Sequence, residues 1–232
     1  PIFPFTECAA NATGWVQTLF RRIQQNGTAT INNTGVPGQV LSQHFEDLGR
    51  RIGRTYPGNF ITNQVPFVKN TTTVLTVFAG GNDANTIGQV IQAQQAGDDL
   101  RAFIDREVAA FGEDMNALVR AVRQRAPNTK IVILNLPNLG ALPYLANASL
   151  AQRQAAQRAS VRMTTTAINT QTGVTIIDLM CDPRVYQSNF FSSDGFHPND
   201  NGYSILGAEV ARAVTTSSYP APRSSCSQMT LF

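Results

Sequence analysis

Hydrophobic residues recur at helical spacing in five stretches of the chain. In the first stretch the apolar positions are Trp15, Val16, Leu19, Phe20 and Ile23, and Gly27 follows as a stop signal. The same criterion predicts helices over residues 14–26, 38–53, 97–126, 149–170 and 200–215. Pro127 ends the third of these, because a proline disfavours helix in the residue before it.

Between these helical stretches lie short apolar runs without a helical stripe. The runs are "TTTVLTVFAG" (71–80), "KIVILNLP" (130–137) and "GVTIIDLM" (173–180), and a further short strand is expected over about residues 28–33. Short apolar strands that alternate with helices are typical of a parallel sheet covered on both faces. We therefore expect a three-layer α/β/α sandwich, with its functional residues in the loops at the carboxyl ends of the strands.

The composition fits a single domain. The chain has 232 residues, of which 42% are hydrophobic and 14% charged, so it is long enough for one large core. We expect this domain over residues 1–216 and an irregular C-terminal tail over 217–232. The net charge of +3 is not concentrated in any block, which disfavours nucleic acid as a partner, and no apolar run is long enough to span a membrane.

The three cysteines, Cys8, Cys181 and Cys226, show neither a CxxC spacing nor neighbouring histidines. This pattern disfavours a zinc site, and we expect no metal and no cofactor. Cys181 and Cys226 both lie in loop-like sequence, so a disulfide between them could hold the tail in an oxidising compartment. Cys8 would then be unpaired within these residues.

Three loops are rich in glycine and asparagine, where the backbone must turn sharply and leave N–H groups free. They are "NTGVPG" (33–38), "GGND" (80–83) and "DGFH" (194–197). An acyl-transfer site needs a nucleophile, a base, a group that orients the base, and donors for an oxyanion.

The loops can supply all of these groups except the nucleophile. His197 can act as the base, and Asp194 lies close enough in the same loop to accept its Nδ1–H. Gly38 can donate a backbone N–H and Asn82 a side-chain N–H to an oxyanion.

The three loops, in this order, resemble the second, third and fifth sequence blocks of the SGNH hydrolases, also called the GDSL family of esterases and lipases. The resemblance implies a flavodoxin-like α/β/α sandwich. It also implies that Gly38 and Asn82 form the oxyanion hole, and that Asp194 and His197 belong to a catalytic triad. Each motif is weak alone, but three in order at strand ends are specific.

The first block of that family, Gly-Asp-Ser after a central strand, is not found before Gly38, since residues 1–34 contain no serine. Ser192 and Ser193 lie on the base's own loop, and the serine-rich "RSSCSQMTLF" (223–232) does not read as a strand followed by Gly-Asp-Ser. We therefore expect the nucleophile and the central first strand upstream of Pro1, on a separate N-terminal segment that carries the serine.

The sequence thus predicts a carboxylic ester hydrolase that works through a serine acyl-enzyme, secreted or extracytoplasmic. Its expected substrates are small-molecule or lipid esters, or acylated polysaccharides. The alternative is a non-catalytic carbohydrate- or lipid-binding module that has lost its nucleophile. The paired Asp194 and His197 favour the enzyme, because binding alone does not require a base beside an aspartate.

Overall fold

The computed structural model describes residues 14–25 and 27–231. Its strands are β1 (Val74–Val77), β2 (Lys130–Leu134) and β3 (Thr175–Ile177). Its α-helices are α1 (Trp15–Gln24), α2 (Gln43–Arg50), α3 (Gly81–Gln92), α4 (Leu100–Arg125), α5 (Leu150–Arg162) and α6 (Asp200–Thr215). A π-helical segment, Met163–Ile168, continues α5.

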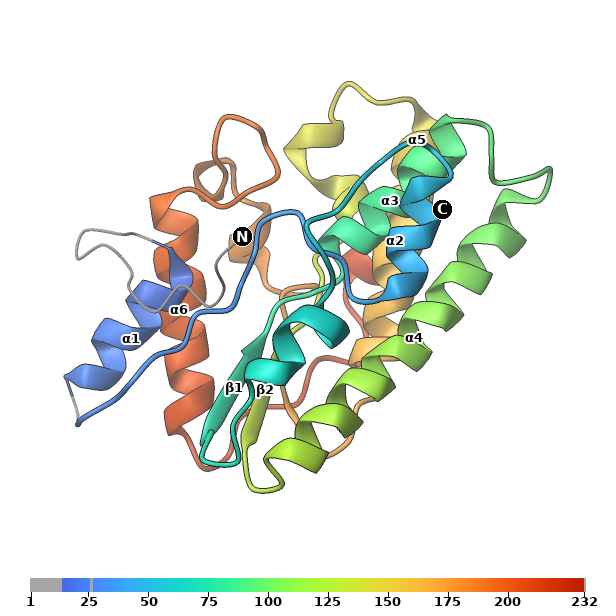
Figure 1. Ribbon diagram of the computed structural model, residues 1–232. Coiled ribbons are helices and arrows are strands. Elements are labelled where there is room, and N and C mark those ends of the chain that lie inside the picture. The colour runs from blue at the N-terminus through green and yellow to red at the C-terminus, as the bar shows by residue number, and fades with distance from the viewer. Residues whose placement is uncertain (1–13, 26, 232) are drawn as a thin grey trace.

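The strands form a parallel sheet in the order β1-β2-β3. Val74 pairs with Lys130 at one end of the first ladder, and Val132 pairs with Thr175 at the start of the second. α1 packs on α6 on one side of this sheet, while α3, α4 and α5 lie on the other (Figure 1). This is the α/β sandwich that the alternation of strands and helices predicted.

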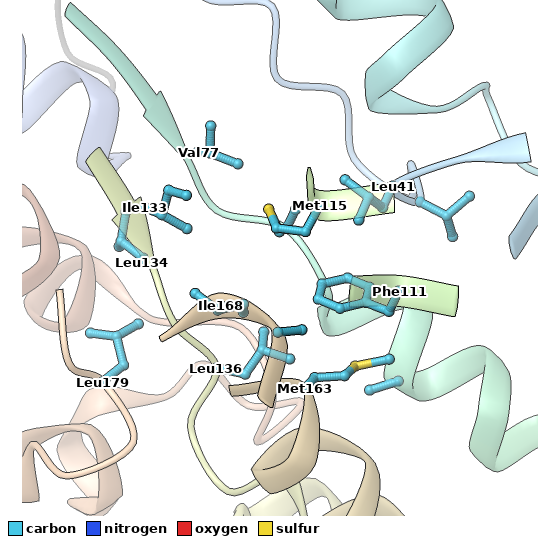
Figure 2. Close-up of a cluster of buried hydrophobic side chains, with 14 of the residues drawn as sticks. Leu41, Val77, Phe111, Met115, Ile133, Leu134, Leu136, Met163, Ile168 and Leu179 are labelled. Atoms are coloured by element: carbon cyan, nitrogen blue, oxygen red, sulfur yellow. The ribbon is translucent and has the colours of Figure 1, made fainter. Parts of the chain in front are cut away.

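The core lies mainly between the sheet and the helices α4 and α5. Figure 2 shows Val77 and Ile133 from the strands facing Phe111 and Met115 of α4. Phe111, Met115 and Ile133 are fully buried. Because these β-branched and large apolar side chains lose all contact with water, each contributes roughly 1.5–3 kcal/mol to folding.

Of the strand predicted over residues 28–33, only Asn33 lies in a β-bridge. Residues 28–32 are not assigned to a strand. The segment offers one large apolar side chain, Ile31, among threonines and asparagines. Such a sequence has little side-chain packing of its own to favour an extended ladder.

The helix predicted over 38–53 begins later, at Gln43. Val40 and Leu41 are buried as expected, but their carbonyls accept hydrogen bonds from the N–H groups of Phe60 and Ile61. The other helix ends agree more closely with the prediction, and α6 covers the predicted range. α3 was not delimited in advance, because "GGND" was interpreted as a loop.

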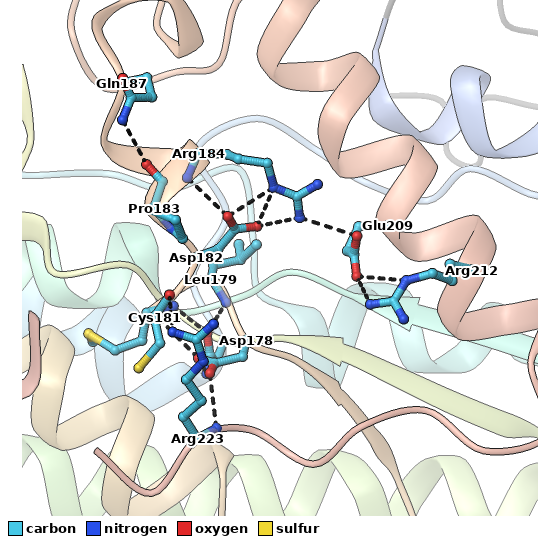
Figure 3. Close-up of polar contacts among 12 residues, drawn as sticks. Asp178, Leu179, Cys181, Asp182, Pro183, Arg184, Gln187, Glu209, Arg212 and Arg223 are labelled. Atoms are coloured by element: carbon cyan, nitrogen blue, oxygen red, sulfur yellow. Dashed lines mark hydrogen bonds and ion pairs between the residues drawn. The ribbon is translucent and has the colours of Figure 1, made fainter. Parts of the chain in front are cut away.

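The C-terminal tail is held against the body of the protein. Cys181 and Cys226 form a disulfide, and the N–H of Arg223 donates to Asp178 Oδ2 at 3.0 Å. Figure 3 shows Arg223 beside Cys181, and next to them an ion-pair network around Arg184 and Glu209. The tail therefore has covalent and polar attachments to the loop that follows β3.

Candidate active site

The loop before α6 holds the predicted base and its partner together. His197 Nδ1 and Asp194 Oδ2 lie 2.6 Å apart, and the other carboxylate oxygen of Asp194 accepts the backbone N–H groups of Phe196 and His197 at 2.9 and 3.0 Å. The carboxylate therefore fixes both the loop and the imidazole ring. With Nδ1 engaged in this way, Nε2 is the nitrogen left to exchange a proton.

Asp194 remains ionised throughout the neutral range. The hydrogen bond from His197, together with the backbone N–H of Phe196, lowers the pKa of Asp194 to about 2. The His197 side chain is 64% exposed, so it is accessible to a reacting molecule. An ionised aspartate beside an accessible histidine is suited to orient a general base.

Two contacts position this loop on the rest of the protein. Gly195, at φ +68°, accepts a hydrogen bond from the N–H of Tyr144, and a Cβ at position 195 would lie only 2.7 Å from that nitrogen. The rings of Phe196 and Tyr144 meet edge to face, with centroids 4.9 Å apart. Tyr144 was not singled out in the sequence, where "PYL" gives no local signal of this role.

Asn82 lies in the first turn of α3, just after the end of β1. The chain enters this helix through Gly80 at φ +108°, where a Cβ would lie 3.0 Å from the side chains of both Phe111 and Leu136. Asn82 Nδ2 donates to the carbonyl of Gln39 at 2.8 Å. The amide has a second N–H, so one donor is available for a ligand.

Asp83 ties the same turn to the loop that contains Gly38. Its Oδ1 accepts the N–H of Leu41 at 2.8 Å, the side chain is fully buried, and Oδ2 has no partner among the described residues. Burial raises the pKa of Asp83 to about 7, against the opposing effect of the hydrogen bond from Leu41. Asp83 therefore has a structural role in joining these two loops.

A single cavity of about 740 Å³ brings three of the predicted residues together. Gly38, Asn82 and His197 all line its wall, although they come from three separate loops. Asp194 is not part of the wall and acts on the site through His197. Phe190, Phe191 and Phe196 add an aromatic surface to the same cavity.

The serines of the base's own loop do not serve as a nucleophile in this arrangement. Ser192 Oγ donates to the carbonyl of Pro198 at 3.1 Å, and its backbone N–H donates to the carbonyl of His197. Ser193 is exposed, and neither serine lines the cavity. Within the described residues, therefore, neither of these serines is engaged with His197.

The other histidine, His44, lies outside this loop. Its Nε2 lies 2.6 Å from Oε2 of Glu107, which is buried in α4. This hydrogen bond raises the pKa of His44. His44 therefore joins α2 to α4 and does not line the cavity.

The described part of the chain contains neither a group of side chains that could bind a metal ion nor a helix that could span a membrane. In residues 14–25 and 27–231 no three or more His, Cys, Asp or Glu side chains are grouped so that they could hold a metal ion. None of the helices described is both long and apolar enough to cross a bilayer.

The fold and the site together define an α/β sandwich with an Asp–His pair and two glycine- and asparagine-containing loops around one cavity. The chain belongs to the GDSL-like lipase/acylhydrolase family, whose model matches residues 4–205. This confirms the resemblance drawn from the three sequence blocks.

Solved structures of lipases share the fold. A lipase from a goat rumen metagenome superposes with a TM-score of 0.54 at 15% identity, covering 95% of this chain and 93% of its own. A GDSL-like lipase from Parabacteroides merdae gives a TM-score of 0.53 at 16% identity, with 90% of each chain covered. No curated protein matches this chain significantly.

Proposed function

We propose that this protein hydrolyses carboxylic esters through a serine acyl-enzyme. The observation that carries the proposal is the 2.6 Å contact between His197 and Asp194 beside a cavity that Gly38 and Asn82 also line. Family membership supports the same chemistry. The sandwich fold alone would not support this chemistry, since one fold serves many reactions.

In the first half of the reaction, a serine hydroxyl attacks the ester carbonyl carbon while its proton passes to Nε2 of His197. Asp194 accepts Nδ1–H and stabilises the imidazolium. The N–H of Gly38 and the free N–H of Asn82 donate to the carbonyl oxygen as it becomes an oxyanion. His197 then gives the proton to the departing alcohol, and the C–O bond of the ester breaks.

In the second half, His197 takes a proton from water, and the hydroxide attacks the acyl-enzyme. The same donors stabilise the second oxyanion, and the serine leaves with the proton from His197. We assign the serine to a separate segment outside the described residues. The hydrogen bond of Ser192 to Pro198 supports this assignment.

The substrates we propose are small-molecule or lipid esters and acylated polysaccharides. The aromatic side chains of Phe190, Phe191 and Phe196 at the cavity suit an apolar acyl group. The disulfide between Cys181 and Cys226 supports a secreted or extracytoplasmic location, because such bonds persist in oxidising compartments.

The test is hydrolysis of p-nitrophenyl butyrate together with labelling by a fluorophosphonate, which captures activated serines. We expect His197→Ala to lower kcat by about 10³-fold or more and to abolish labelling, because the proton then has no acceptor. The chain's other histidine offers a matched control: His44→Ala should keep near-normal kcat. A His197→Ala variant with wild-type hydrolysis would refute the proposal. Folded protein that neither hydrolyses nor labels would favour the binding module instead.

A further inference from the structure

The loop that contains Gly38 leads directly into α2, and its last residue is Ser42. Ser42 occupies the N-cap position of α2, where a serine side chain ordinarily accepts a backbone N–H from the first turn of the helix. Here the buried side chain makes no capping hydrogen bond to the described residues of α2. Its hydroxyl instead donates to Oδ2 of Asp114 in α4, at 2.5 Å. Ser42 therefore joins the loop to a different helix.

The same face of α4 also supports Asn82. Asp114 and Phe111 are three residues apart, so their side chains leave α4 on one face. Phe111 is fully buried against the turn at Gly80, where an added Cβ would lie 3.0 Å from its ring. That turn is the entry to α3, which carries Asn82 in its first turn. One face of α4 therefore contacts both segments that hold the proposed oxyanion donors.

The middle of the loop is bound to the start of α3. The carbonyl of Gln39 accepts the side-chain N–H of Asn82, and the N–H of Leu41 donates to Asp83. Leu41 also belongs to the buried apolar cluster that contains Phe111 (Figure 2). Together with the hydrogen bond from the last residue of the loop, these contacts hold the loop between α3 and α4.

The direction of the Gly38 N–H depends on this loop as a whole. Gly38 has a φ of +84°, in the left-handed region. A backbone N–H has no side chain to rotate, so only the conformation of the loop can aim it. Because a hydrogen bond weakens steeply when its donor leaves the favoured distance and angle, a small shift of the loop would weaken the contact with an oxyanion.

We propose that Ser42 and Asp114 are positioning residues for the oxyanion hole. Their hydrogen bond holds the Gly38 loop at the distance from Asn82 that a developing oxyanion requires. Neither Ser42 nor Asp114 lines the cavity, so both act through the backbone of the loop and not by contact with the substrate. This inference rests on the proposed function, because it concerns the same site.

The competing interpretation is a purely structural tie between α2 and α4, and a second contact separates the two interpretations. Nε2 of His44 lies 2.6 Å from Oε2 of Glu107, so this pair also joins α2 to α4. His44 lies inside α2, two residues further along the chain from Gly38 than Ser42 is. Loss of either contact should destabilise the protein, but only loss of the Ser42 contact should weaken oxyanion binding.

The first test is the rate of p-nitrophenyl butyrate hydrolysis by Ser42→Ala, Asp114→Ala and Asp114→Asn, with His44→Ala as the control. Each of the first two substitutions should lower kcat about 10-fold and change KM by less than about 2-fold, because donor placement matters most in the transition state. Asp114→Asn keeps an oxygen that accepts from Ser42, so it should retain at least about a third of the wild-type kcat. Wild-type kcat in Ser42→Ala, or an equal fall in His44→Ala, would overturn the proposal.

Inhibition by a trifluoromethyl ketone separates an effect on the oxyanion from a loss of folded protein. The serine oxygen adds to the ketone carbon, its proton passes to His197, and the ketone oxygen becomes the oxyanion. The inhibition constant should therefore rise about 10-fold in Ser42→Ala, in step with the fall in kcat/KM, and keep its wild-type value in His44→Ala. A lower kcat with an unchanged inhibition constant in Ser42→Ala would indicate partial unfolding and overturn the proposal.

Amide hydrogen exchange tests the attachment of the loop without any reaction. The N–H of Leu41, which donates to Asp83, should exchange at least about 10-fold faster in Ser42→Ala than in wild type, while that of Ile133 in β2 should not change. Unchanged exchange at Leu41 would overturn the proposal. If exchange responds as expected but the wild-type protein does not hydrolyse the ester, the attachment of the loop stands and the proposed function fails.

Discussion

At the scale of single residues, two aspartates show how environment sets the charge of the same side chain. Asp194 lies at the surface and accepts three hydrogen bonds, which lower its pKa to about 2. Asp83 is fully buried with one accepted hydrogen bond from Leu41, and its pKa rises to about 7. Asp194 therefore suits a permanent charge beside His197, whereas Asp83 keeps its proton to a much higher pH while it joins two loops.

The raised pKa of Asp83 predicts how stability depends on pH. The unfolded chain loses this proton near pH 4, but the folded protein holds it to about pH 7. Between these values the folded state binds more protons, so the contribution of Asp83 to the free energy of unfolding falls as pH rises, by at most about 1.4 kcal/mol per unit.

Asp83→Asn does not titrate, so it should gain stability relative to wild type between pH 4.5 and 7.5. Urea unfolding of both proteins at pH 4.5 and at pH 7.5 measures the difference in the free energy of unfolding. Asp98→Asn, at an exposed aspartate, is the matched control and should follow the wild-type profile. An Asp83→Asn profile parallel to wild type would contradict this prediction.

At the scale of elements, the loop around Gly195 shows how a backbone position orients a side chain two residues away. Gly195→Ala would place a Cβ 2.7 Å from the N of Tyr144, so the loop must shift and His197 must move. We expect a loss of about 2 kcal/mol in unfolding free energy and at least a 10-fold fall in kcat for p-nitrophenyl butyrate.

Gly173 provides the matched control for this change. It has the same φ of +68°, but a Cβ added there would have no atom within 4 Å. Gly173→Ala should therefore cost only about 1 kcal/mol, from the left-handed backbone, and leave kcat unchanged. Equal effects of the two substitutions on kcat would show that close packing at Gly195 does not orient His197.

At the scale of the whole molecule, the Cys181–Cys226 disulfide closes a loop of 45 residues that contains α6 and His197. Cross-linking a loop of this length restricts the unfolded chain, so Cys226→Ser should lower the free energy of unfolding by between about 2 and 4 kcal/mol. Urea unfolding measures the loss. The hydrolysis rate should change little under conditions where the variant is folded, and wild-type stability of Cys226→Ser would refute the prediction.

The alternation of helices and apolar runs determined the fold class, the three strands β1 to β3 and the full extent of α6. It did not hold for residues 28–32, because extended structure depends on the segments that pair with it. It also left α3 undefined. Ala84, Ile87, Val90 and Ile91 do have helical spacing, but Gly81, Asn82 and Gly88 weaken the local signal.

The sequence by itself determined the family and the motifs that indicate it: a histidine three residues after an aspartate, and glycines and asparagines where strands end. Local spacing was sufficient to predict that these two side chains meet, since Asp194 and His197 share one turn. Only the tertiary structure decided that loops about 40 and 115 residues apart line one cavity, and that Asp83 is buried. These properties depend on which distant segments of the chain pack against a given side chain and exclude water from it. A local sequence pattern does not specify those segments.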